Sequence, residues 1–355
     1  MTALSEILIR QIRTIGAMNV ADYMAACLMH PEHGYYTTRD PLGRSGDFVT
    51  APEISQMFGE LLGLSLAQAW MDQGAPNPFA LAELGPGRGT LMADVLRATR
   101  HVPGFHEAME VHLVEASAPL RQVQAETLEG YAPTWHDGVG TLPERPLFLL
   151  ANEFFDALPM RQFLRDGDGW RERMVTVTED RLALGLSESA PLDALADRLV
   201  DTEDGDLVET SAPAVSLAAQ IGERIARNGG AALIVDYGSW ASKGDTLQAV
   251  AGHRKRDPLE APGEADLTGH VAFGPMAAAT PCAHTALVPQ GVFLERLGIT
   301  ARAQALARRL TGAALENHIA AHRRLTHPDE MGHLFKVMGF HPDTAPPPPG
   351  LLHDA

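Results

Sequence analysis

Residues 79–90 read Phe-Ala-Leu-Ala-Glu-Leu-Gly-Pro-Gly-Arg-Gly-Thr, and this stretch decides the fold. Its apolar part, 79–84, predicts a short buried strand, and the glycines that follow predict a tight turn into a helix. Gly85, Gly87 and Gly89 have no Cβ, so the backbone there can turn sharply and a ligand can come close to it. The pattern is typical of a nucleotide-binding turn in an α/β protein.

An acid just before the turn narrows the choice of ligand. Glu83 places a carboxylate where a dinucleotide-binding loop normally has none. This indicates a nucleoside cofactor without a pyrophosphate, and S-adenosyl-L-methionine is the leading candidate. A plain left-handed turn and a nicotinamide site are the alternatives for the glycines.

Strands and helices alternate after this turn, which predicts an α/β fold with a doubly wound sheet. Strands are expected at 79–84, 111–115, 134–136, 146–152, 231–235 and 333–338, and helices at 4–15, 20–28, 54–71, 90–99, 119–128, 212–227, 267–273, 289–297 and 300–324. Residues 30–53 are expected to form a long loop, and a loop of that length in a compact protein usually carries function.

The same pattern divides the chain into regions. We expect an N-terminal helical region and active-site loop at 1–75, a Rossmann-like core at 76–159 and 206–345, inserted substrate-side segments at 160–205 and 238–285, and a flexible tail at 346–355. Within the first insertion, two alternating runs flank Asp166-Gly167-Asp168-Gly169, which indicates a β-hairpin.

Acids also follow the other predicted strands. In a doubly wound sheet, ligands bind at the C-terminal ends of the strands, beside the point where the strand order reverses. Glu115 ends the second strand, and its two carboxylate oxygens suit the two ribose hydroxyls of a nucleoside. Asp137 is expected near the adenine, and Asn152 and Glu153 near the methionine end or the acceptor. A helix-capping or solvent-facing carboxylate is the alternative for Asp137 and Glu153.

Composition limits the function classes. The 355 residues carry a net charge of −17, which disfavours nucleic-acid binding and favours a basic protein partner. Cys27 and Cys282 are too few for a disulfide framework, and no stretch approaches the roughly 20 apolar residues of a membrane span, so we expect a cytoplasmic protein. The histidines have no accompanying cysteines, so no metal site is expected.

Four longer motifs occur in a characteristic order. They are Gly-Asp-Phe-Val-Thr at 46–50, Glu-Leu-Gly-Pro-Gly-Arg-Gly-Thr at 83–90, Asn-Glu-Phe-Phe-Asp-Ala-Leu-Pro at 152–159, and Asp-Leu-Thr-Gly-His-Val-Ala-Phe at 266–273. Together they resemble the MidA-like methyltransferase family, which includes the mitochondrial complex I assembly factor that dimethylates an arginine. The resemblance spans roughly residues 16–340.

The resemblance implies a class I methyltransferase fold with an inserted second lobe and S-adenosyl-L-methionine as donor. It also implies a protein arginine as acceptor, as in the mitochondrial members, with a complex I subunit as the expected partner. A guanidinium stays protonated, so a carboxylate must orient it and accept a proton. The motifs offer Asp47, Glu53, Glu153 and Asp156 for this role, and Gly46 for the cofactor. Asp47 can equally bind the cofactor, and Asp156 can equally cap a turn.

Two other functions remain open on the sequence. One is methylation of a small molecule or of another side chain. The other is a cofactor-binding assembly factor with little turnover, a role that an acidic surface would suit. The glycine turn bears on the methyl donor, and it carries no information about the acceptor.

Overall fold

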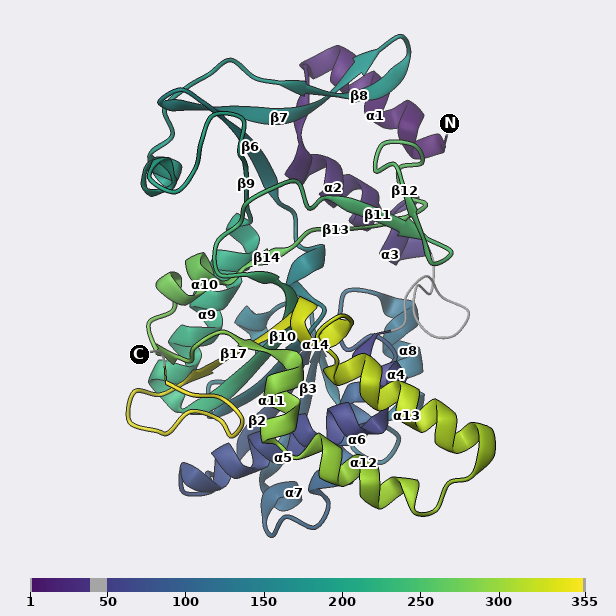
Figure 1. Ribbon diagram of the computed structural model, residues 1–355, viewed down its shortest axis with the longest axis vertical. Coiled ribbons are helices and arrows are strands. Elements are labelled where there is room, and N and C mark those ends of the chain that lie inside the picture. The colour runs from purple at the N-terminus through teal and green to yellow at the C-terminus, as the bar shows by residue number, and fades with distance from the viewer. Residues whose placement is uncertain (1, 39–49, 354–355) are drawn as a thin grey trace.

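The computed structural model describes residues 2–38 and 50–353, and they form two lobes, one above the other in Figure 1. The lower lobe is built on a nine-stranded mixed sheet. Its main path runs β15 (Ala283–His284), β17 (Phe335–His341), β10 (Gly230–Ser239), β5 (Leu147–Asn152), β2 (Phe79–Leu84), β3 (Met109–Val114) and β4 (Thr134–His136). Two short strands, β14 (Val271–Ala272) and β16 (Val288–Pro289), pair with β10 and β17.

The strand order confirms the predicted doubly wound, class I methyltransferase arrangement. The five strands from β4 to β10 are parallel to their neighbours, and β17 is antiparallel to β10. The chain runs outward from β2 through β3 to β4, then returns to β5 on the other side of β2. The strand order therefore reverses at β2, where a sheet of this kind binds its ligand.

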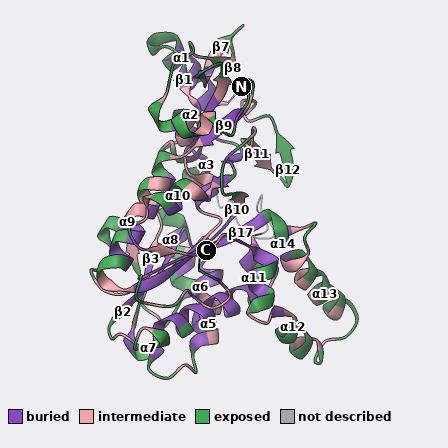
Figure 2. Ribbon diagram, turned by 60° about the vertical axis from the view of Figure 1, so that its left-hand side comes forward, coloured by how far each residue is buried: buried purple, intermediate pink, exposed green. Residues whose placement is uncertain are grey.

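Alternate side chains of the strands enter two different cores. On β2, Phe79 and Leu81 pack with α5 (Gln56–Asp72) and α6 (Thr90–Thr99), whereas Ala80 and Ala82 pack with α9 (Ala212–Asn228). The helices α10 (Phe273–Ala279), α11 (Gln290–Arg296) and α12 (Ile299–Ala307) complete the two layers. Because both faces are covered, the central strands are buried throughout, as Figure 2 shows.

The upper lobe is formed by the N-terminal helices together with the strands of the two inserted segments. It contains α1 (Ala3–Ile15), β1 (Met18–Asn19), α2 (Val20–Met29) and α3 (Tyr35–Thr38), the strands β6 (Arg161–Asp166), β7 (Gly169–Thr178), β8 (Arg181–Leu186) and β9 (Leu207–Thr210), and the small sheet β11 (Gln248–Ala251), β12 (Arg254–Arg256) and β13 (Asp266–Thr268). The hairpin predicted around residues 166–169 is β6–β7. Leu8, Tyr23, Val175 and Leu267 share one hydrophobic core, so the N-terminal and inserted segments fold together.

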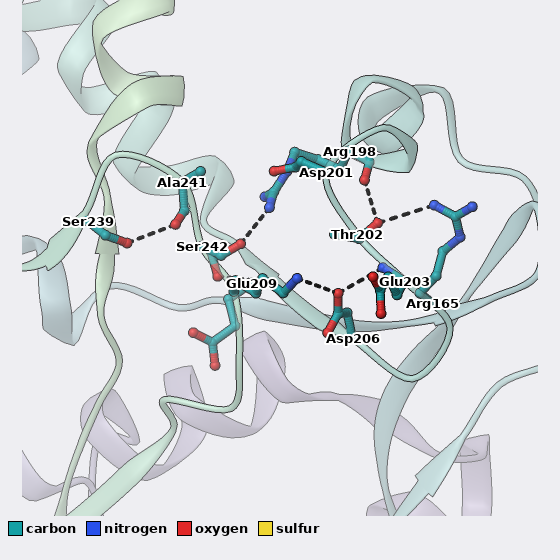
Figure 3. A network of polar contacts seen from close by, with 11 residues as sticks. Arg165, Arg198, Asp201, Thr202, Glu203, Asp206, Glu209, Ser239, Ala241 and Ser242 are labelled. Atoms are coloured by element: carbon teal, nitrogen blue, oxygen red, sulfur yellow. Dashed lines mark hydrogen bonds and ion pairs between the residues drawn. The ribbon is translucent and has the colours of Figure 1, made fainter.

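Polar contacts tie the upper lobe to the segment that follows β10 (Figure 3). Arg198 donates from Nη2 to the Ser242 carbonyl oxygen at 2.7 Å, and the Ser242 hydroxyl accepts from the Glu209 backbone N–H at 2.9 Å. Lys243 forms an ion pair of 2.7 Å with Asp206. These contacts hold the loop after β10 against β9.

Four structural expectations need correction. Residues 267–273 are not a helix: Leu267 pairs with Ala249 on β11, and Val271 pairs with Gly238 on β10, so their partners lie far away in sequence. The single helix expected at 300–324 is two helices, α12 and α13 (Gly312–Thr326), because Gly312 has φ +54 and interrupts the helical backbone.

The other two corrections concern the N-terminal loop and the tail. The loop expected at 30–53 contains α3 and α4 (Ala51–Ile54), and Ser55 then caps α5 by accepting from the Met57 N–H at 3.2 Å. The tail expected to be flexible packs on the lower lobe as far as it is described. Ser65 donates to the Pro349 carbonyl oxygen at 2.8 Å, and Leu351 is buried.

Candidate cofactor and acceptor site

A cavity of about 410 Å³ lies at the C-terminal ends of β2, β3 and β5, where the strand order reverses. Most of the predicted site residues line it: Glu83, Gly85, Gly87, Glu115, Asp137, Asn152 and Glu153. Gly89 is the N-terminal cap of α6, and Asp156 is buried close to the cavity wall. Gly46 and Asp47 lie outside the described residues.

The glycine turn has the backbone that the sequence predicts. Gly85, Gly87 and Gly89 have φ values of +57, +54 and +80, in the left-handed region that favours glycine. A Cβ at Gly85 would also lie 2.7 Å from the Cδ2 atom of Phe154. The turn therefore requires glycine for its backbone conformation and, at Gly85, for space.

Glu83 offers an unsatisfied acceptor next to this turn. Its side chain is 3% exposed, and burial raises its pKa to about 8, against the opposing effect of a hydrogen bond from the Met92 backbone. Its Oε2 atom is buried and has no hydrogen-bond partner within the described chain. A buried acceptor without a partner is costly, so the site suits a ligand that donates hydrogen bonds there, as an ammonium group does.

Glu115 is held in place for a ligand with two hydroxyls. Its Oε1 accepts from the Ser117 backbone N–H at 2.8 Å, and its Oε2 accepts from Gln124 Nε2 at 3.1 Å. The same Gln124 amide donates to the Gly87 carbonyl oxygen at 2.8 Å. Gln124 thus links the ribose-binding candidate to the glycine turn. Sequence reasoning missed this residue, because a glutamine on a helix carries no distinctive pattern.

Asp137 lies at the exposed rim of the cavity. Its side chain is 90% exposed and forms an ion pair of 2.5 Å with Arg121, whose guanidinium also donates to the Glu115 carbonyl oxygen. Asp137 therefore faces solvent, as the alternative expected, and it lines the cavity near Glu115, to which Arg121 links it.

Glu153 occupies a constrained position directly after β5. Its φ is +51, which is unusual for a residue with a Cβ, and its N–H donates to the Val235 carbonyl oxygen at 2.9 Å. Its Oε1 accepts from the Ala51 N–H and from Asn152 Nδ2, each at 3.1 Å. Burial and the nearby Asp156 carboxylate raise the pKa of Glu153 to about 7. It therefore caps α4 and lines the cavity at the same time.

Asp156 stands on the same turn and is 7% exposed. Burial raises its pKa to about 6, and a hydrogen bond from Tyr237 opposes the rise. Its Oδ1 atom is buried and has no hydrogen-bond partner within the described chain. Asp156 lies within the 3₁₀ turn η2 (Phe155–Ala157), and hydrogen bonds from the backbone of Ala157 and of Asp156 itself also oppose the rise in its pKa, which agrees with the turn-capping alternative.

Two further carboxylates shape this end of the cavity: Asp236, to which sequence reasoning assigned no role, and Glu53, which it offered as a candidate to orient the acceptor. Asp236, within β10, is fully buried, and its Oδ2 accepts from the backbone N–H groups of Phe154, Phe155 and Asp156. Glu53 lines the cavity, and its Oε1 accepts from the Thr90 hydroxyl at 2.6 Å, which joins α4 to α6. Asp236 stands in the motif Asp-Tyr-Gly at 236–238, which was the available signal for it.

The chain is similar to known methyltransferases over nearly its whole length. A family model of S-adenosyl-L-methionine-dependent methyltransferases matches residues 61–291. The protein arginine methyltransferase NDUFAF7, mitochondrial, of Danio rerio is 37% identical over 354 residues, covering 92% of this chain and 84% of the relative. The protein of the same name from Homo sapiens is 36% identical over 366 residues, covering 94% of this chain and 82% of the relative.

Solved structures agree with this. The crystal structure of a methyltransferase-like protein from Burkholderia thailandensis, bound to S-adenosyl-homocysteine, superimposes with a TM-score of 0.81 at 29% identity, covering 96% of this chain and 92% of the other. The unfilled acceptor at Glu83, the glycine turn and the held carboxylate of Glu115 fit such a cofactor. The chain belongs to the MidA-like family of S-adenosyl-L-methionine-dependent methyltransferases.

Proposed function

We propose that this methyltransferase modifies an arginine of a protein partner. The observation that carries the proposal is the position of Glu153: a buried carboxylate in the wall of the cofactor cavity, on the turn after β5. The relatives named protein arginine methyltransferase support the same acceptor, and they match more than nine-tenths of this chain. We further propose a complex I subunit as the partner, in keeping with the resemblance of the motifs.

The roles of the residues follow from the chemistry of a guanidinium. S-adenosyl-L-methionine, when bound, supplies a methyl group on a positively charged sulfur. Glu115 and the glycine turn would hold the nucleoside, and Glu83 would accept hydrogen bonds from the amino group. These contacts position the donor, and positioning is the main contribution that a displacement of this kind needs.

Glu153 orients the acceptor and takes its proton. A carboxylate can hold a guanidinium through two parallel hydrogen bonds, which aims one nitrogen at the methyl group. Methylation leaves a nitrogen with one proton too many, and a carboxylate with a pKa near 7 is a better acceptor for it than an ordinary one. Asp156 adds negative charge beside Glu153, and we assign it a supporting role. For Asp47 the proposal is contact with the acceptor or the cofactor.

The location of the protein is part of the same proposal. Cys27 and Cys282 are both buried and unpaired, which suits the reducing cytoplasm. In the described part of the chain, no helix combines the length and the apolar character needed to cross a membrane. We propose a cytoplasmic protein with a protein partner.

Methyl transfer from labelled donor tests the acceptor directly. The purified protein is incubated with S-adenosyl-L-methionine carrying a labelled methyl group and an extract of cells from which its gene has been deleted. We expect label on an arginine of one protein, located by mass spectrometry. Glu153→Gln should greatly reduce the label, while Glu110→Gln, which changes a half-exposed residue at the far end of β3, should retain it. Label confined to small molecules or to another side chain would overturn the proposal.

A further inference from the structure

Tyr36 is a residue of the upper lobe that lines the cavity. It lies on α3 and lines the same cavity as Glu153. Its hydroxyl donates to Asp266 Oδ1 at 2.9 Å, and Asp266 is a buried residue of β13. The acceptor end of the cavity is therefore built from both lobes: the upper lobe contributes the ring of Tyr36, and the lower lobe contributes the carboxylate of Glu153.

Two buried carboxylates stand close to the Tyr36 hydroxyl. Asp266 and Asp156 are 6% and 7% exposed, and both raise the pKa of the Tyr36 hydroxyl, so both lie near it. The segments that carry them are joined, since the Gly269 N–H donates to the Asp156 carbonyl oxygen at 3.0 Å. Asp156 keeps one buried oxygen, Oδ1, that no described group satisfies.

This concentration of negative charge calls for a positive ligand. Burying carboxylates is costly unless protons or a cation compensate them. Among the described residues, a positive charge that acts on Glu153 is Arg324 on α13, an exposed side chain whose effect on the pKa of Glu153 is the smallest of the causes, and Arg88 also lines the cavity. The cavity is thus lined by the ring of Tyr36 and the carboxylate of Glu153, and the buried carboxylates of Asp266 and Asp156 lie close to the Tyr36 hydroxyl.

We propose that Tyr36, with Asp266 and Asp156 behind it, makes the acceptor pocket selective for a planar, delocalised cation, a guanidinium. The inference rests on the proposed function and names the residues that select its acceptor. A guanidinium stacks on an aromatic face and binds a carboxylate edge-on through two hydrogen bonds. An ammonium is compact and strongly hydrated, and a neutral amide gains nothing from the buried charge.

Three matched ligands separate charge from shape. Each carries adenosine joined at its 5′ position, through the same short linker, to a guanidinium, to a urea, or to an ammonium group. Urea has the shape of guanidinium without the charge, and ammonium has the charge without the plane. Calorimetry of the full chain should show the guanidinium ligand bound at least about 10-fold more tightly than either of the others.

Substitutions then assign the selectivity to residues. Tyr36→Leu should lower the preference for guanidinium over ammonium by about 3- to 10-fold, and Tyr36→Phe should restore most of it because the ring remains. Asp266→Asn should lower the preference for guanidinium over urea by at least about 5-fold, because it removes a buried charge. Asp245→Asn, which removes a half-exposed carboxylate of the upper lobe, is the matched control and should change neither ratio.

Affinity for S-adenosyl-homocysteine, measured on each variant, reports whether the cofactor site is intact. Unchanged affinity together with a lost preference supports the proposal. A wild-type preference that survives both Tyr36→Leu and Asp266→Asn overturns the proposed role of these residues and leaves arginine methylation standing. Equal binding of all three ligands by the wild-type protein contradicts the arginine acceptor itself.

Discussion

The carboxylate of Asp236 accepts a hydrogen bond of 2.9 Å from the backbone N–H of Phe155. The same oxygen accepts from the N–H groups of Phe154 and Asp156, each at 3.2 Å. Three consecutive backbone N–H groups therefore converge on one buried oxygen within β10. This contact fixes the turn after β5, on which Glu153 stands.

Asp236→Asn should damage both stability and catalysis. The amide is nearly isosteric, but its NH₂ group is a donor and must face backbone N–H groups that also donate. We expect the free energy of unfolding to fall by about 1–3 kcal/mol, the cost of leaving a buried donor without its partner. Urea denaturation measures this, and single-turnover methyl transfer should fall more than affinity for S-adenosyl-homocysteine does. A fully active variant of wild-type stability would refute the role of Asp236.

The rate of methyl transfer should rise with pH through about 7. Glu153 must be ionised to hold a guanidinium and to accept its proton, and burial beside Asp156 raises its pKa to about 7. Below that pH the carboxyl is protonated and the rate falls. The profile of kcat/KM between pH 5.5 and 8.5 checks this. Glu153→Gln should be slow at every pH and should lose this inflection; the same inflection in that variant would assign it to another group.

Local sequence patterns predicted many strands of the central sheet. The strand predicted at 79–84 is β2 with the same bounds, and that at 134–136 is β4, because an apolar run or a short alternation bounded by turn residues is sufficient for such strands. The residues 267–273 show the limit of this reasoning. Their apolar spacing suits a helix, but the pairing of β13 with β11 and of β14 with β10 determines their structure. Such partners lie outside any local window.

The cofactor half of the site was predictable and the acceptor half much less so. Glu83, the glycines and Glu115 follow consecutive strands, so strand order alone brings them together. Tyr36 and Asp266 come from segments about 230 residues apart, joined by a hydrogen bond within the upper lobe. Nothing local in either segment specifies that contact, because it depends on how the N-terminal helices pack on the inserted strands.

Gly85→Ala should impair the turn. The residue has φ +57, and a Cβ would lie 2.7 Å from a ring carbon of Phe154. The backbone conformation alone costs about 1–3 kcal/mol for a residue with a side chain. We expect lower thermal stability and a weaker affinity for S-adenosyl-homocysteine in calorimetry. Gly138→Ala is the control, because its backbone is extended and a Cβ there meets no atom within 4 Å. Equal behaviour of the two variants would contradict this account.

Glu115→Gln should weaken cofactor binding by about 10- to 100-fold, the range expected when a hydrogen-bonding charge is lost. The amide keeps one acceptor oxygen, but its NH₂ group must replace an oxygen that accepts from the Ser117 N–H or from Gln124. Calorimetry with S-adenosyl-homocysteine measures the change. Glu110→Gln removes a carboxylate from β3, the strand that precedes Glu115, away from the cavity, and should bind as the wild type does. Equal affinity of both variants would exclude the ribose-binding role.

The stability of the ligand-free protein should fall as pH rises, because of Glu83. Burial raises its pKa in the folded state to about 8, whereas in the unfolded chain it titrates near 4.5, the ordinary value for a glutamate. Between pH 5.5 and 7.5 the folded protein therefore keeps a proton that unfolding releases, so each unit of pH costs about 1.4 kcal/mol of stability through this group.

The variant Glu83→Gln tests this because its side chain cannot release that proton. Urea denaturation at several pH values should thus show a shallower decline for the variant, and the same variant should bind S-adenosyl-homocysteine more weakly, because an amide is a poorer partner for an ammonium group than a carboxylate. An identical pH slope in both proteins would show that Glu83 is already ionised in the folded state, and that its carboxylate is compensated by the chain itself.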